Sequence, residues 1–233
     1  MLAVEGLHAH YGRAHILHGV SLTVGRGEVV CLLGRNGAGK STTMKAIMGL
    51  VPPSAGSVRF EGASLAGRPP HAVARAGIGY VPEERRIFAD LTVLENLEVG
   101  RRPARPQLRP WTPEQLFALF PSLGAMRHRT GGRMSGGEQQ MLTIARTLMG
   151  NPRLLLLDEP SEGLAPVVVE RMAAAIAELK AEGLSILLSE QNLTFAGAVA
   201  DRACILEVGQ VRHEGPMDAL LADAPLRARY LSV

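Results

Sequence analysis

The sequence predicts an α/β protein with a mostly parallel sheet, an N-terminal antiparallel β subdomain and an inserted α-helical subdomain. Short apolar runs that resemble buried strands alternate with helical segments through most of the chain, which is typical of a parallel sheet covered on both faces. Residues 1–33 read instead as consecutive strands. Residues 83–133 are mainly helical and rich in arginine and proline, which indicates an insertion into the core.

The N-terminal strands are justified by hydrophobic pattern. Leu2–His10 alternates apolar and polar side chains, as a half-buried strand does, and Ile16–Val24 and the fully apolar Val29–Leu33 follow it. Glycine-containing turns at 11–13 and 25–27 separate these segments. We therefore expect three strands before residue 34.

The rest of the chain alternates helices and short strands. Helices are expected at Thr42–Leu50, His71–Ala76, Val93–Val99, Pro113–Phe120, Gly137–Met149 and Val167–Ala181, with a short helical tail. Strands are expected at Ser57–Phe60, Ile78–Val81, Arg153–Leu157, Ser185–Ser189, Arg202–Val208 and Val211–Glu214. These elements predict one domain over residues 1–233, with a core of 1–82 and 137–233 and a helical insert of 83–136. The basic connection 101–110 inside the insert is expected to be a solvated loop or, less simply, a surface for membrane headgroups or a partner.

Composition limits the possible classes. The 233 residues are 46% hydrophobic, carry a formal charge of +3 and have a pI near 9.2, so the chain can bury a full core and its mild positive charge does not argue for nucleic acid. Cys31 and Cys204 lie in apolar runs and are expected to be buried thiols, and the histidines look scattered. The first residues lack the pattern of a signal peptide and no run approaches ~20 apolar residues, so we expect a cytoplasmic protein.

One glycine-rich segment carries the clearest functional signal: Gly34-Arg35-Asn36-Gly37-Ala38-Gly39-Lys40-Ser41. It lies between an apolar strand and a helix, the context that a Walker A phosphate loop requires, and makes the expected core that of a P-loop NTPase. Glycines let backbone N–H groups point inward, and the helix adds its positive N-terminal end. Lys40 can reach the β- and γ-phosphates and Ser41 can hold Mg²⁺. The loop, through Thr42, is predicted to bind a nucleoside triphosphate.

Two carboxylates follow a second buried strand. The four leucines 154–157 lead into Asp158 and Glu159, and ligands of parallel α/β sheets sit at the carboxyl ends of strands. Asp158 is therefore expected beside the phosphate loop, where it can hold Mg²⁺. Glu159 is expected to orient and deprotonate a water that attacks the γ-phosphate.

A second anion site is predicted at the segment Met134-Ser135-Gly136-Gly137-Glu138-Gln139-Gln140. Ser135 can cap the following helix, and the N–H groups of Gly136 and Gly137 are exposed at its positive end. Alone, this pattern is equally compatible with a simple capped helix. Because the chain then has two phosphate sites and only one lysine between them, the simplest use is a head-to-tail dimer that encloses ATP between chains.

With these motifs in this order, the whole chain resembles the nucleotide-binding subunit of an ATP-binding cassette (ABC) transporter. The resemblance implies ATP hydrolysis and makes Ser135, Gly136, Gly137 and Gln139 the family's signature segment, which contacts the nucleotide. Tyr11 falls where the family has an aromatic side chain that stacks on adenine, although a structural tyrosine in a turn is the alternative.

Three positions depart from the family pattern. Glu83 stands where most members have glutamine, and its carboxylate can still ligate Mg²⁺. Gln191 replaces a histidine; its amide can donate to the γ-phosphate but cannot titrate. Ala165 replaces an aspartate. Arg85 and Arg86, just beyond Glu83, are candidates for a contact with membrane subunits or, alternatively, a solvated pair.

The departures are themselves similar to one subgroup, the second ATPase subunit of branched-chain amino acid importers, with urea and short-chain amide importers close by. This likeness implies a related ATPase subunit as hetero- or homodimer partner, integral membrane permease subunits, a solute-binding protein that acts indirectly, and no nucleic acid. It implies a peripheral position on the cytoplasmic face of the inner membrane. The alternatives are an exporter ATPase for lipid or polysaccharide and a soluble ABC ATPase of DNA repair or translation. A P-loop phosphotransferase is more remote.

Overall fold

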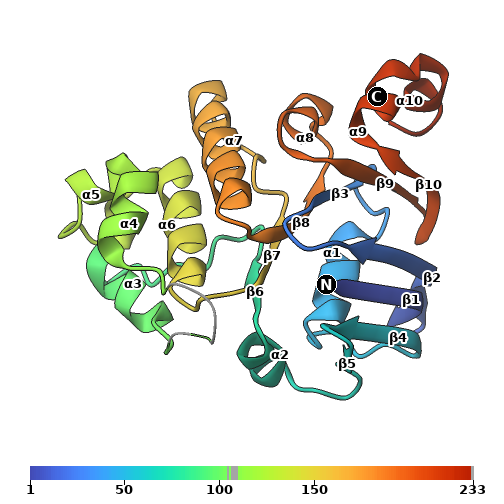
Figure 1. Cartoon of the computed structure of the whole chain (residues 1–233), viewed down its shortest axis with the longest axis horizontal. Coiled ribbons are helices and arrows are strands. Elements are labelled where there is room, and N and C mark those ends of the chain that lie inside the picture. The colour runs from blue at the N-terminus through green and yellow to red at the C-terminus, as the bar shows by residue number, and fades with distance from the viewer. Residues whose placement is uncertain (104, 106–109, 232–233) are drawn as a thin grey trace.

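The computed structural model describes residues 1–103, 105 and 110–231, which form two sheets with helices packed on them (Figure 1). One sheet has four antiparallel strands in the order β2-β1-β4-β5, and the other has six strands in the order β10-β9-β3-β8-β7-β6. The first sheet contains β1 Leu2–Tyr11, β2 Ala14–Val24, β4 Ala55–Phe60 and β5 Ala63–Ser64. The second contains β3 Val29–Leu33, β6 Ile78–Val81, β7 Leu154–Asp158, β8 Ser185–Glu190, β9 Arg202–Glu207 and β10 Gln210–Pro216.

The six-stranded sheet is parallel except at one edge. Strands β6, β7, β8, β3 and β9 run in the same direction, and β10 pairs antiparallel with β9. Every residue of β3, β7 and β8 is buried, since both faces of this part of the sheet are covered. That double burial explains why these strands are continuous apolar runs in the sequence and confirms the predicted sheet.

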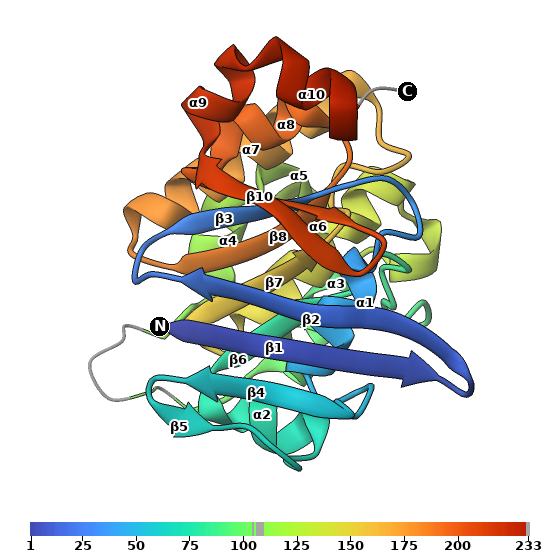
Figure 2. The same cartoon turned by 90° about the vertical axis from the view of Figure 1, so that its right-hand side faces the viewer.

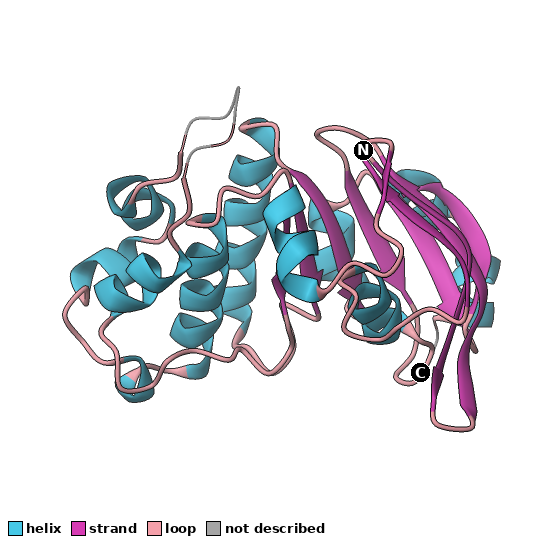
Figure 3. Cartoon of the chain, turned by 90° about the horizontal axis from the view of Figure 1, so that it is seen from below, coloured by secondary structure: helices cyan, strands magenta, loops and turns pink. Residues whose placement is uncertain are grey.

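Helices cover the parallel sheet in two layers. Helix α1 lies between the two sheets, and most other helices pack on the opposite face (Figures 1 and 3). The helices are α1 Lys40–Ile47, α2 Pro70–Ala76, α3 Val93–Gly100, α4 Pro113–Leu119, α5 Pro121–Ala125, α6 Gly136–Leu148, α7 Pro166–Ala181, α8 Leu193–Val199, α9 Met217–Ala222 and α10 Ala224–Tyr230, with a 3₁₀ turn at Gly131–Arg133. None of the described helices is long and apolar enough to cross a membrane.

Two apolar clusters correspond to these layers. One fills the space between the antiparallel sheet, α1 and the near face of the parallel sheet, as Leu7, Met44 and Leu187 illustrate. The other joins the far face of that sheet to the remaining helices, and it includes Leu142 of α6 and Leu188 of β8. Figure 2 shows the antiparallel sheet as an outer layer, seen face-on. The two helices that begin at the phosphate loop and at the second anion segment thus lie on opposite faces of one sheet.

The predicted insert contains helices α3, α4 and α5 and no strand among its described residues. Its buried side chains, such as Leu97 and Leu116, belong to the same apolar cluster as the sheet. The division into core and insert therefore stays a prediction. Residues 104 and 106–109 of the basic connection lie outside the described residues; residues 101–103 and Pro110 are exposed, as expected of a solvated loop, and Arg105 is the exception. Its guanidinium donates to the carbonyl oxygens of Asn151, Arg75 and Ala74.

Several short elements were not predicted. The two-residue strand β5 and the five-residue helix α5 are too short for a hydrophobic period to develop. Helix α8 had a usable signal that was overlooked, because the Asn192 side chain caps it by accepting a hydrogen bond from Phe195 N at 3.1 Å. Cys31 and Cys204 are buried free thiols, as expected, and burial raises the pKa of both.

Candidate functional site

The loop between β3 and α1 is pressed against neighbouring backbone, which explains its glycines. A Cβ at Gly34 would collide with the carbonyl oxygen of Leu206 in β9. Gly39 has a φ of 106°, in the left-handed region, and a Cβ there would lie 2.9 Å from Leu17 of β2. Arg35, Asn36 and Gly37 are exposed at the outside of the loop, whereas Ala38 and Thr42 are buried beneath it.

The N-terminus of α1 is prepared for an anion. Its N-cap residue provides no side-chain hydrogen bond, and its first turn contains no acidic residue. No side chain of the helix itself therefore neutralises its positive end. Lys40 is the first residue of α1 and is 4% exposed. Its Nζ donates to the carbonyl oxygens of Gly34 at 2.7 Å and Arg35 at 3.2 Å. The same Nζ lies 3.1 Å from Oε1 of Glu159. The loop, the lysine and the predicted base are therefore one cluster.

Ser41 and Asp158 lie together, as predicted. The Ser41 hydroxyl donates to Oδ1 of Asp158 at 2.9 Å, and Asp158 is 1% exposed. Two further donors hold the carboxylate: Ser189 Oγ to Oδ1 at 2.7 Å and the Tyr80 hydroxyl to Oδ2 at 2.9 Å. Burial and the charge of Asp158 raise the pKa of Tyr80, which keeps its hydroxyl a donor. A hydroxyl and a carboxylate oxygen at this separation are a donor set that fits Mg²⁺.

Glu159 follows β7 in a constrained conformation. Its φ of 45° is rare for a residue other than glycine, and such outliers gather at functional sites. Its N–H is directed at Ser189, 3.1 Å from the hydroxyl and 3.2 Å from the carbonyl oxygen. Gln191 Nε2 donates to Glu159 Oε2 at 3.3 Å. Burial raises the pKa of Glu159, but the hydrogen bond with Glu162, the charge of Lys40 and the Gln191 amide outweigh it and lower the pKa below its usual value.

The carboxyl group of Glu162 interacts with that of Glu159. The hydrogen bond between the two carboxyl groups is the main reason that the pKa of Glu162 is raised to about 7, and burial and the charges of Glu159, Glu83 and Glu190 add to it. Glu83 is exposed just after β6. Its negative charge lies close enough to Glu162 to help raise the pKa of that carboxyl group. Among the described residues no hydrogen bond joins Glu83 to Ser41 or Asp158, so its role as a Mg²⁺ ligand stays a prediction.

Glu190 was missed by the sequence reasoning. Its carboxylate is 1% exposed and accepts from the N–H groups of Ser161 at 3.1 Å and of Gln191 and Asn192 at 3.2 Å. Burial raises its pKa, while these hydrogen bonds oppose the rise. Glu190 thereby ties the segment after β7 to the segment after β8. Ser189 and Glu190 end a parallel strand beside β7, so the rule that located Asp158 could have found them.

The second anion segment begins α6, as predicted. Ser135 Oγ accepts from Glu138 N at 3.4 Å, and Glu138 Oε2 accepts from Ser135 N at 2.7 Å, which makes a capping box. Gly137 is buried against Val168 of α7, and Gln139 Nε2 donates to the Gly131 carbonyl at 3.1 Å. Because α6 and α1 pack on opposite faces of the parallel sheet, one chain does not bring Ser135 together with Lys40 (Figure 1).

Tyr11 ends β1 at the β1–β2 hairpin, and the residue is 48% exposed. The described contacts include none between it and the phosphate loop, so adenine stacking stays a prediction. Four of the seven histidines are not scattered, which corrects the sequence reading for these four. His15 stacks on His8 and His10 and makes a tilted ring contact with His18, since the pairing of β1 with β2 brings them together. In the described part of the chain, no group of three or more His, Cys, Asp or Glu side chains could hold a metal ion.

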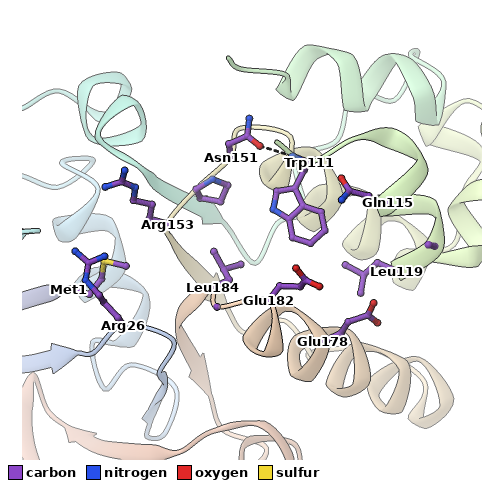
Figure 4. A pocket seen from close by; sticks show the side chains of 13 residues that line it. Met1, Arg26, Trp111, Gln115, Leu119, Asn151, Arg153, Glu178, Glu182 and Leu184 are labelled. Atoms are coloured by element: carbon purple, nitrogen blue, oxygen red, sulfur yellow. Dashed lines mark hydrogen bonds between the residues drawn. The ribbon is translucent and has the colours of Figure 1, made fainter. Parts of the chain in front are cut away.

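A groove of 700 Å³ lies elsewhere, at the opposite end of the parallel strands (Figure 4). Arg153 and Leu184, which precede β7 and β8, line it together with Trp111 and Glu182. The phosphate loop and Asp158 lie at the carboxyl ends of those strands. The groove therefore belongs to another surface than the cluster around Lys40.

Comparison with known proteins agrees with this geometry. The family model described as "ABC transporter" matches residues 17–162. The chain is 42% identical over 99% of both chains to the high-affinity branched-chain amino acid transport ATP-binding protein BraG of Pseudomonas aeruginosa. It is 36% identical to the lipopolysaccharide export system ATP-binding protein LptB of Haemophilus influenzae, over 99% of this chain and 97% of that one. A crystal structure of a nucleotide-free ATP-binding cassette from an ABC transporter superposes with a TM-score of 0.84 and 29% identity, covering 100% and 99% of the two chains.

Proposed function

This chain belongs to the ABC transporter family and is an ATPase, and from that premise we propose that it drives import of a small solute, a branched-chain amino acid. The observation that carries the ATPase part is the cluster in which buried Lys40 pairs with Glu159 while Ser41 bonds Asp158. The solute class is supported by the 42% identity to BraG over nearly the whole of both chains.

The site residues divide the work of hydrolysis. Lys40 and the backbone N–H groups of the phosphate loop bind the β- and γ-phosphates of ATP, and Tyr11 stacks on the adenine. Ser41 and Asp158 would hold Mg²⁺, with Glu83 as a further ligand, and that ion would neutralise charge on the phosphates. Glu159 accepts the proton of the attacking water, and Gln191 orients both the carboxylate and the γ-phosphate.

The buried ion pair must open during this cycle. Lys40 cannot contact phosphate fully while its Nζ is held by Glu159 and two loop carbonyls. Binding of the triphosphate gives Lys40 a new anionic partner, which frees Glu159 to bind water. The Ser189 contacts at its backbone N–H keep Glu159 in place during the exchange.

A second chain completes the site. In this proposal the partner's signature segment, equivalent to residues 135–139, covers the γ-phosphate and excludes bulk water. Support comes from the placement of α1 and α6 on opposite faces of one sheet, which separates the two segments within a single chain. The partner is a second copy or a related ATPase. Closure of the pair moves the permease subunits, which hold the assembly at the cytoplasmic face of the inner membrane.

Export is the second candidate function, because the chain is also 36% identical to LptB over 99% of its length. Both candidates use the same hydrolytic site and differ in the permease. A complex purified with its own permease subunits and placed in vesicles would distinguish them. ATP-dependent accumulation of leucine, isoleucine or valine, absent in Lys40→Ala, supports import.

If the vesicles accumulate urea or a short-chain amide instead, the proposed solute is wrong and the proposed direction of transport, import, is supported. ATP hydrolysis with no uptake, accompanied by lipid extraction, would favour export. Absence of hydrolysis by the wild-type complex would contradict the ATPase mechanism itself. Arg59→Ala, a change on the exposed face of β4, serves as the control and should transport normally.

A further inference from the structure

Arg85 lies against the second anion segment instead of extending into solvent. A Cβ at Gly136 would collide with Nη1 of Arg85, so the guanidinium covers the first glycine of α6. A Cβ at Gly163, in the segment after β7, would lie 3.9 Å from Nη2. The guanidinium therefore bridges the start of α6 and the segment that follows Glu159 and Glu162.

The backbone fixes this position. Arg85 and Arg86 both have positive φ, 63° and 46°, which is unusual for consecutive residues other than glycine. The Thr143 hydroxyl donates to the Arg85 carbonyl at 2.5 Å, and Arg146 Nη2 donates to the Arg86 carbonyl at 2.7 Å. Two side chains of α6 thus hold the turn that aims Arg85 at the start of the same helix.

No carboxylate among the described residues forms an ion pair with Arg85. Its side chain is half-buried, and its guanidinium makes no hydrogen bond or ion pair with the described residues. The neighbouring Arg86, by contrast, lies 3.6 Å from Glu84. The Glu138 carboxylate of the capping box already lies at the positive end of the 13-residue helix α6, and the Arg85 guanidinium lies beside the same helix end. An anion bound there would accept hydrogen bonds from the guanidinium and would gain from the helix dipole.

We propose that Arg85 contacts the γ-phosphate of the ATP held by the other chain, as the cation of a segment that contains no lysine. This inference rests on the proposed two-chain site and deepens it. Arg85 would donate to phosphate oxygens alongside the N–H groups of Gly136 and Gly137, whereas Lys40 binds the same triphosphate from its own chain. Its contact beside Gly163 would link that binding to the segment behind Glu159.

The test is complementation between two impaired variants of the full chain. Arg85→Ala is expected to lower ATP turnover at least about tenfold, the loss of one charge-assisted hydrogen bond, with Arg85→Lys partly active. Its binding of a fluorescent ATP analogue to the single chain should match wild type, because the cradle with Lys40 is intact. The control Arg59→Ala, on the exposed face of β4, should retain normal turnover.

Mixing Arg85→Ala with Lys40→Ala should raise turnover above that of either variant alone. In the mixed dimer, one site combines an intact Lys40 cradle with an intact Arg85 from the opposite chain. A mixture that stays inactive, or an Arg85→Ala chain that loses binding of the analogue, would overturn the assignment while leaving the proposed function standing. If the wild-type chain hydrolyses ATP only as a monomer, the two-chain site is wrong, and so is the assignment of Arg85 to the γ-phosphate.

Discussion

Lys40 Nζ lies 3.1 Å from Glu159 Oε1, and the two side chains are only 3% and 7% exposed. Removing one charge of such a buried pair is destabilising, because the other charge is left buried without a partner. The pair also means that nucleotide and Glu159 compete for the same lysine. Turnover and nucleotide affinity should therefore respond in opposite directions when Glu159 is neutralised.

Glu159→Gln should lower the turnover number by about 10²- to 10⁴-fold, since the general base is lost. Nucleotide should bind at least as tightly as to wild type, because Lys40 is no longer held by a carboxylate. Phosphate release and equilibrium binding of ATP measure the two effects. Glu170→Gln, an exposed change on α7, is the control. Unchanged turnover in Glu159→Gln would remove this residue from its role.

Tyr80→Phe should raise the Mg²⁺ concentration needed for half-maximal turnover by about tenfold. The change removes the hydroxyl that donates to Asp158 at 2.9 Å, a partner that orients a proposed metal ligand. Titration of ATPase activity with Mg²⁺ at saturating ATP gives the result. Tyr230→Phe on α10 is the matched control and should titrate as wild type does. An equal Mg²⁺ requirement in both variants would refute the role of Tyr80.

Glu162→Gln should flatten the dependence of thermal stability on pH. The pKa of Glu162 is raised from 4.5 to about 7 in the folded protein, so the folded state keeps a proton that the unfolded chain has lost in this window. Stability therefore falls as pH rises through about 7. Melting temperatures measured from pH 5 to 8 should show that the stability of Glu162→Gln relative to wild type increases toward pH 8. A constant difference across that range would contradict the raised pKa of Glu162.

Gln191→Ala should reduce turnover without changing the shape of the pH–rate profile, because the amide that donates to Glu159 at 3.3 Å does not titrate. Gln191→His should instead add an ionisation near pH 6.5. Turnover measured between pH 5.5 and 9 tests both expectations. An ionisation that disappears in Gln191→Ala would contradict the assignment. A gain of orders of magnitude in Gln191→His would mean that a partner ATPase performs most of the hydrolysis.

The sequence by itself determined the parallel core and predicted the residues that cluster at the carboxyl ends of its strands. Local patterns were sufficient there: the doubly buried strands are continuous apolar runs, and the glycine-rich segment occurs between such a strand and a helix. The rule that ligands gather at the carboxyl ends of parallel strands then placed Asp158 beside Ser41, at 2.9 Å.

Only the tertiary structure decided which distant groups meet. Tyr80, Ser189 and Glu190 reach the site because β6, β7 and β8 are neighbours in the sheet, an order that no local pattern encodes. The stacked histidines depend on cross-strand register, and the position of Arg85 depends on a left-handed turn held by α6. Hydrophobic period and propensity act along one element, whereas these contacts join different elements, in most cases separated by tens of residues, and arise only when the elements pack.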